Sequence, residues 1–156
     1  MKRIIFLVLI SSIITSFNRT ENKKLISESQ LKFIKEKYKW NSENLLVINF
    51  VQAKKNCFYD NNSNLANSLT WSKKFYSKIN LDNILNIYVY SDKKSAKTVI
   101  DSKTKFEDFD DFLLNNFFNK RDCYGILVIN SNGEYEIKEG EYLESDVERF
   151  IKALKK

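Results

Sequence analysis

Three apolar runs constrain the fold of this chain more than any other feature of its sequence. They are Leu45–Val51 (LLVINFV), Ile84–Tyr90 (ILNIYVY) and Ile126–Asn130 (ILVIN). A strand that faces water on one side alternates apolar and polar residues, whereas a strand covered on both faces is apolar almost throughout. The three runs therefore predict buried strands in the middle of a sheet that carries helices on both faces.

Apolar residues at helical spacing occupy the segments around these runs. Ser27 and Gln30 form a capping-box pattern before an apolar stripe, and Ser145 and Glu148 repeat that pattern near the C-terminus. The polar segment after the second run allows one short helical turn at residues 99–100. The predicted helices cover residues 27–39, 64–79, the phenylalanine-rich 106–118 and the chain from Ser145 onward.

A hairpin joins the third run to a fourth strand. Asn132-Gly133 is a strong turn signal, and Glu134–Glu139 (EYEIKE) alternates charged and apolar residues as an exposed edge strand does. The order of elements is then a helix, a βαβ unit, a further helix and a ββα unit. A parallel crossover followed by an antiparallel hairpin predicts an α/β fold with a mixed central sheet flanked by helices.

The composition excludes several classes of function. The chain has 156 residues, of which 43% are hydrophobic, enough for one domain with a core, which we expect over residues 27–155. It has no histidine, which removes Ser–His and Cys–His catalysis, and two cysteines alone do not make a zinc site. The net charge of +6 is interspersed with acidic residues, so we expect no nucleic-acid binding.

The first residues have the pattern of a secretory signal peptide. Lys2 and Arg3 precede an apolar stretch that begins at Ile4 and is followed by small residues. The stretch is about 14 residues long, which is short for a membrane span. We expect cleavage after Ser16 or Phe17, so that residues 1–17 are the leader and the mature protein is periplasmic or secreted. Only an uncleaved leader would bring the protein to a membrane.

Two cysteines stand at the ends of two predicted strands. Cys57 follows the run Leu45–Val51 after a short basic loop and precedes a helical pattern, and Cys123 stands just before the third run. A cysteine between a strand and a helix resembles the placement of the redox thiols in the thioredoxin-like superfamily, especially in its exported bacterial members. The resemblance covers about residues 44–155. It extends to the terminal block of strand, Asn-Gly turn, strand, Gly140 and helix.

The chain departs from that family at two positions. The family's C-x-x-C motif is absent, since counting from Asn49 places its first cysteine on Lys55 and its second on Phe58, one residue beyond Cys57. The family's cis-proline position falls on Tyr124 or Gly125, and the chain contains no proline. A cis bond before another residue costs about 2.5–4 kcal/mol, so we expect a trans peptide here.

The resemblance also implies a site. In this fold the loop of the cis-proline position packs against the cysteine loop, so Cys57 and Cys123 should be neighbours and form a disulfide after export. Tyr124 and Gly125 would shape the loop beside the bridge. The mouth of the former thiol pocket would be lined by Lys55, Asn56 and Phe58. No cofactor is implied.

Two functions remain open for this site. In the first, the protein is a redox-degenerate binding module with a structural disulfide, and the former thiol pocket binds a client protein or peptide. In the second, the protein is a noncanonical thiol–disulfide oxidoreductase, in which the Cys57 thiolate attacks a client disulfide and Cys123 resolves the mixed disulfide. The reduction potential of the Cys57–Cys123 disulfide distinguishes the two functions.

A third hypothesis makes the protein an envelope-interaction protein that docks through Phe106–Phe118. We interpret that aromatic stripe as core, and Trp40 and Trp71 as packing residues. The acidic residues at positions 107, 108, 110 and 111 alternate with phenylalanines as on a solvated helix face, which makes a metal site there the weaker interpretation.

Overall fold

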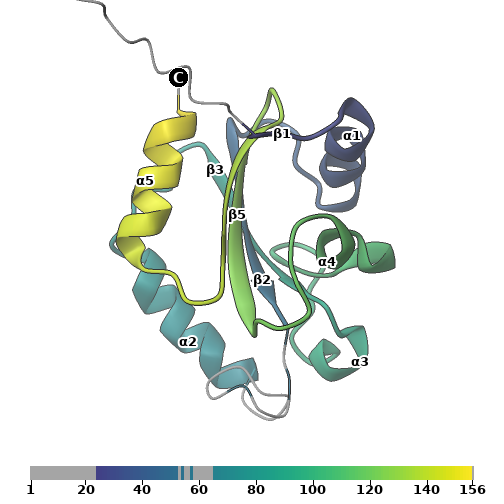
Figure 1. Cartoon of the computed structure of the whole chain (residues 1–156). Coiled ribbons are helices and arrows are strands. Elements are labelled where there is room, and N and C mark those ends of the chain that lie inside the picture. The colour runs from purple at the N-terminus through teal and green to yellow at the C-terminus, as the bar shows by residue number, and fades with distance from the viewer. Residues whose placement is uncertain (1–23, 53, 55–56, 58–64, 156) are drawn as a thin grey trace, which may run out of the picture.

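The computed structural model describes residues 24–52, 54, 57 and 65–155. Within these residues the chain forms one six-stranded mixed sheet in the order β1-β6-β5-β2-β3-β4, with helices on both faces (Figure 1). The predicted α/β class is confirmed. The strands are β1 (Lys24–Leu25), β2 (Leu45–Val51), β3 (Ile84–Tyr90), β4 (Lys105–Glu107), β5 (Tyr124–Asn130) and β6 (Glu134–Glu139).

The helices form two layers around the sheet. Helices α2 (Leu65–Tyr76) and α5 (Glu144–Leu154) cover one face, and α1 (Glu28–Lys37) and α4 (Phe112–Asn116) cover the other (Figure 1). The short α3 (Lys93–Ala96) follows β3. None of the helices in the described part of the chain is both long and apolar enough to span a membrane. The predicted leader, residues 1–17, lies outside that part.

The central strand β2 is buried at all seven positions, as its continuous apolar sequence predicts. It pairs in parallel with β3 and antiparallel with β5, so that Val51 lies opposite both Tyr90 and Tyr124. Its side chains at positions 46, 48 and 50 pack toward α1 and α4, and those at positions 45 and 47 pack toward α2 and α5. Val51 belongs to a third cluster, with Leu65 of α2 and Ala96 of α3. The predicted βαβ unit (β2, α2 and β3) and ββα unit (β5, β6 and α5) therefore meet through the pairing of β2 with β5.

The phenylalanine-rich segment differs from its prediction. Residues 106–118 do not form one helix, because Asp110 and Asp111 adopt left-handed conformations with φ of 57° and 53°. The segment instead contains β4, a 3₁₀ turn and α4. The Asp108 carboxylate is buried and accepts the N–H groups of Leu113 and Leu114 at 2.8 and 2.9 Å. Asp108 is therefore a capping residue, and the prediction of a solvated position is wrong.

Three smaller predictions also need correction. The short helical turn is α3, residues 93–96, and lies before residues 99–100. Strand β6 is not a free edge throughout, because β1 pairs with Glu134 and Tyr135. Trp40 is 2% exposed as predicted, but Trp71 is 60% exposed at the margin of the buried stripe of α2.

Candidate functional site

A disulfide joins Cys57 and Cys123 at the end of the sheet where β2 finishes and β5 begins. The sulfur–sulfur distance is 2.09 Å and the Cα atoms are 5.9 Å apart, although 66 positions separate the residues. The antiparallel pairing of β2 and β5 brings both segments to this end. The pairing continues one residue further, because the Gln52 N–H donates to the Cys123 carbonyl oxygen at 2.7 Å. The predicted disulfide is confirmed.

The two bridged residues have different environments. Cys57 is 3% exposed, and its Sγ lies 3.5 Å from the carbonyl oxygen of Gln52. The backbone N–H of Cys57 donates to the Lys54 carbonyl oxygen at 3.1 Å. Cys123 is half-buried. The bridge therefore has one inaccessible end and one end that lies nearer to solvent.

Side chains from the end of β2 hold the loop that precedes Cys123. The Gln52 side chain is buried and its Nε2 donates to the Asn119 carbonyl oxygen at 2.6 Å. Lys54 Nζ donates to the carbonyl oxygens of Asp122, at 3.1 Å, and of Lys120. These contacts fix the loop without using the disulfide.

The same loop is also held from β6. The Glu139 carboxylate accepts the backbone N–H of Asn119 at 2.8 Å and also its side-chain amide. Asn119 Nδ2 donates to Asp122 Oδ2 at 2.6 Å, and Asn119 Oδ1 accepts the Arg121 N–H at 2.7 Å. Hydrogen bonds from two neighbouring elements thus preorganise the backbone beside Cys123.

Gly125 and Tyr124 do lie beside the bridge, in the first two positions of β5. A Cβ atom on Gly125 would lie 2.6 Å from Phe118 Cε1, so this position requires the absence of a side chain. The Phe118 ring stacks on Phe50 with a centroid distance of 4.4 Å. Tyr124 donates to Glu141 at 3.4 Å. No cis peptide bond occurs in the described segments, so the peptide here is trans as predicted.

A buried polar cluster lies two residues before the end of β2. Asn49 is 1% exposed, and its Oδ1 accepts the hydroxyls of Tyr76 at 2.6 Å and Tyr142 at 2.8 Å. Its Nδ2 donates to the Ile87 carbonyl oxygen at 2.8 Å and to Asn86 Oδ1 at 2.7 Å. Burial raises the pKa of Tyr76 well above its usual value, so this hydroxyl stays protonated.

Sequence reasoning missed this cluster, although a signal was available. Asn49 is the only polar residue in the apolar run Leu45–Val51. A buried amide must find partners for its donor and acceptor atoms, so its position indicated polar groups on the covering elements. The partners come from α2, β3 and the segment between β6 and α5.

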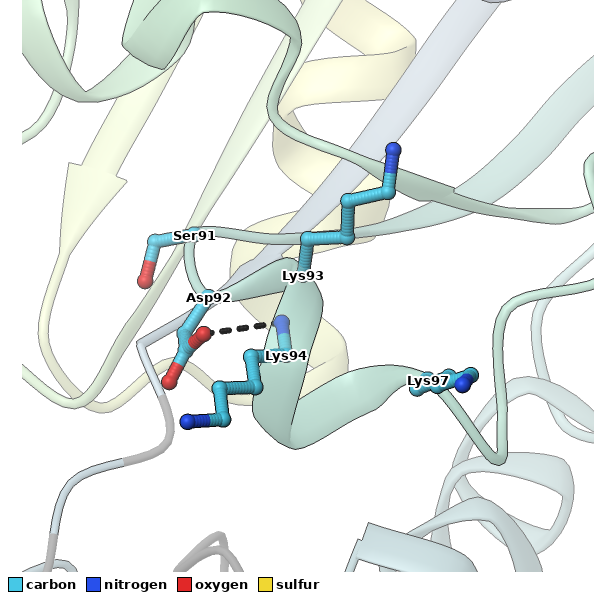
Figure 2. A pocket seen from close by; sticks show the side chains of 5 residues that line it. All are labelled: Ser91, Asp92, Lys93, Lys94 and Lys97. Carbon is cyan, nitrogen blue, oxygen red and sulfur yellow. Dashed lines mark hydrogen bonds between the residues drawn. The ribbon is translucent and has the colours of Figure 1, made fainter.

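A surface depression of about 640 Å³ adjoins the same end of the sheet and is lined by Ser91, Asp92, Lys93, Lys94 and Lys97. Ser91 is tied to β2 by the hydrogen bond from its N–H to the Val51 carbonyl oxygen at 3.0 Å. The carboxylate of Asp92 caps α3, and its pKa is lowered by the Ser95 hydroxyl. Figure 2 shows that the three lysine side chains point away from one another. They do not converge on a common ligand position.

Lys55, Asn56 and Phe58 lie outside the described residues. Within residues 24–52, 54, 57 and 65–155, no cluster of three or more His, Cys, Asp or Glu side chains is arranged to hold a metal ion.

The described site therefore consists of a bridge with one buried end, a preorganised loop and the first residues of β5. The chain matches no protein-family model, no curated protein and no solved structure, so the function of the site has to follow from the geometry of its own residues.

Proposed function

We propose that this chain is an exported thioredoxin-like domain that binds a client protein or peptide at the end of the sheet where Cys57 and Cys123 meet. In this proposal the disulfide is a structural staple. The four strands β3-β2-β5-β6 support the thioredoxin-like assignment, because β2 and β3 are parallel while β5 and β6 are antiparallel, as the βαβ and ββα units require.

The burial of Cys57 is the observation that carries the structural role of the bridge. Reactive cysteines are partly exposed, whereas buried cysteines are usually inert. Cys57 is 3% exposed, and the loop that carries Cys123 is held by hydrogen bonds from Gln52 and Lys54. A bridge in a fixed frame with one inaccessible sulfur stabilises the end of the sheet.

The bridge and the leader pattern of residues 1–17 both support the proposal of export. Disulfides persist in the periplasm and outside the cell, whereas cytosolic thiols are kept reduced. Fusion of residues 1–20 to a reporter enzyme that is active only after export tests this part. In a control fusion, Lys2 and Arg3 are replaced by glutamate and aspartates interrupt Ile4–Ile10. If the control keeps the full reporter activity, the result argues against a leader.

The reduction potential of the Cys57–Cys123 bridge tests the structural role. A structural disulfide has a potential below about −300 mV and resists the glutathione pool. Equilibration of the whole chain with dithiothreitol and with glutathione buffers, followed by alkylation and intact-mass measurement, gives the potential. A value near −200 mV, typical of exchanging pairs, would contradict the staple.

Client binding is tested at Tyr124, which lies next to the bridge on β5. A photo-crosslinking phenylalanine analogue in place of Tyr124 should form defined adducts in the host envelope. The matched control carries the same analogue in place of Lys152, an exposed residue in the last turn of α5. Identical adducts from both positions, or none from Tyr124, would contradict a client site at this end of the sheet.

The second candidate function is a noncanonical thiol–disulfide oxidoreductase that uses the same pair. The half-buried position of Cys123 favours it, because a client thiol or disulfide can reach that residue. The test is reduction of insulin, or of a small disulfide coupled to glutathione. Turnover that disappears in Cys57→Ser supports this function, and the absence of turnover in the natural chain removes it.

A further inference from the structure

We propose that Cys123, and not Cys57, is the sulfur at which external thiols react with this protein, and that Cys123 is therefore its site of mixed-disulfide modification by low-molecular-weight thiols. This assignment reverses the roles that the sequence suggested, in which Cys57 attacks. It concerns which of the two sulfur atoms the external thiol attacks. It holds whether the bridge is a slow structural staple or a fast exchanging pair.

The two bridged residues differ in their exposure to solvent. Exchange begins when a thiolate attacks one sulfur of the disulfide, and its rate depends on which sulfur can be reached. Cys57 is 3% exposed, whereas Cys123 is half-buried. An incoming thiol can therefore approach the bridge from the side of Cys123.

Polarity around Cys57 acts in the same direction. Its Sγ lies 3.5 Å from the Gln52 carbonyl oxygen, whose negative dipole end repels an approaching thiolate. After reduction, the Cys57 S–H can donate a hydrogen bond to the same oxygen.

The backbone around Cys123 stays fixed when the bridge opens. Gln52 N–H donates to the Cys123 carbonyl oxygen at 2.7 Å, and Lys54 Nζ donates to that of Asp122 at 3.1 Å. The Glu139 carboxylate holds Asn119 from β6 at 2.8 Å. None of these contacts involves sulfur, so Cys123 keeps its half-buried position in the reduced protein.

The chemical step is balanced with glutathione as the co-reactant. The glutathione thiolate forms a bond to Cys123 Sγ while the bond between the two cysteine sulfurs breaks. Cys57 leaves with the electron pair and takes a proton from water. A second glutathione thiolate then attacks the glutathione sulfur of the mixed disulfide. This releases oxidised glutathione and the Cys123 thiolate, so two thiols are oxidised and one disulfide is reduced.

Peptide mapping of the natural chain tests the direction of attack. The oxidised protein is incubated with glutathione, quenched with acid, alkylated with N-ethylmaleimide, digested and analysed by mass spectrometry. We expect glutathione on the Cys123 peptide and N-ethylmaleimide on the Cys57 peptide of the singly modified species. Glutathione on Cys57, or equal amounts on both residues, overturns the proposal.

Single-cysteine variants give a second measurement that does not depend on opening the bridge. Cys57→Ser leaves Cys123 free, and Cys123→Ser leaves Cys57 free. In the folded state, Cys123 should react with an aromatic disulfide reagent at least about tenfold faster than Cys57, since the reagent reaches Cys123 more easily. In concentrated urea the two rates should converge. Equal rates in folded variants, with circular dichroism as the control for folding, contradict the assignment.

These outcomes are separate from those of the proposed function. A potential near −200 mV would refute the structural staple and leave the assignment of Cys123 intact. Glutathione on Cys57 would refute the assignment and leave the staple intact.

Discussion

Replacement of Gly125 by alanine tests the packing beside the disulfide. The new Cβ would lie 2.6 Å from Phe118 Cε1, 2.9 Å from Phe118 Cδ1 and 3.0 Å from the Lys138 carbonyl oxygen. The ring cannot retreat freely, because it stacks on Phe50 at a centroid distance of 4.4 Å and an interplanar angle of 6°. The Lys138 oxygen belongs to the backbone of β6 and cannot swing aside. Overpacking of this kind costs about 1–3 kcal/mol.

Urea unfolding measures this cost. Gly125→Ala should lower the unfolding midpoint with an unchanged m-value, because the surface exposed on unfolding is the same. In a Phe118→Leu background the ring clash is gone while the Lys138 contact remains, so alanine should cost less by about 1 kcal/mol. A change in the free energy of unfolding below about 0.5 kcal/mol in the natural background would refute the reasoning. An equal cost in both backgrounds would show that Phe118 is not the obstacle.

Three further perturbations test other parts of the structure. Reduction of the Cys57–Cys123 bridge should lower the free energy of unfolding by about 4 kcal/mol, as expected for a loop closed over 66 positions, and a loss under about 1 kcal/mol in urea would contradict this. Asn49→Leu should cost about 1–3 kcal/mol, because the buried Tyr76 hydroxyl loses its hydrogen bond to Asn49 Oδ1, and an unchanged thermal unfolding midpoint would contradict this. A hydrogen bond from Lys138 lowers the pKa of Asp146 to about 2, below the unfolded value of about 3.9. The advantage of the natural chain over Asp146→Asn should therefore be complete above about pH 4 and fade as the pH falls toward 2, whereas a constant difference in urea midpoints would exclude this role.

The sequence predicts the centre of this fold well because burial leaves a local trace there. A strand covered on both faces must be apolar throughout, and β2 has the bounds of its apolar run, Leu45–Val51. The sequence also predicts the start of α1 from its capping box. Ser27 Oγ accepts the Gln30 N–H at 3.2 Å, and Gln30 Oε1 accepts the Ser27 N–H at 3.0 Å.

The errors arise where the conformation of one residue or a distant partner decides. Helical spacing of phenylalanines indicates a helix, but it does not reveal that Asp110 and Asp111 turn left-handed or that β4 pairs with β3. The spacing around Trp71 does not reveal that its ring lies outside the buried stripe of α2.

The same distinction between local sequence patterns and distant partners applies to the candidate site. The pairing of Cys57 with Cys123 followed from the family resemblance, and no pattern in the chain itself joins the two positions. The partners of Lys54 are carbonyl oxygens of residues 120 and 122, and a backbone carbonyl has no signature in sequence. The unequal burial of the two bridged residues likewise depends on how the segments fold over each other.

The hydrogen bond from Gln52 to Cys123 gives the bridge a particular mechanical character. The Gln52 N–H already holds the two chain segments together beside the covalent link, because it donates to the Cys123 carbonyl oxygen at 2.7 Å. Breaking the sulfur–sulfur bond therefore does not part the neighbouring strands, and it acts on the entropy of the unfolded chain more than on the shape of the folded one. Oxidation in this protein therefore stabilises an arrangement of the two segments that their main-chain hydrogen bond already holds.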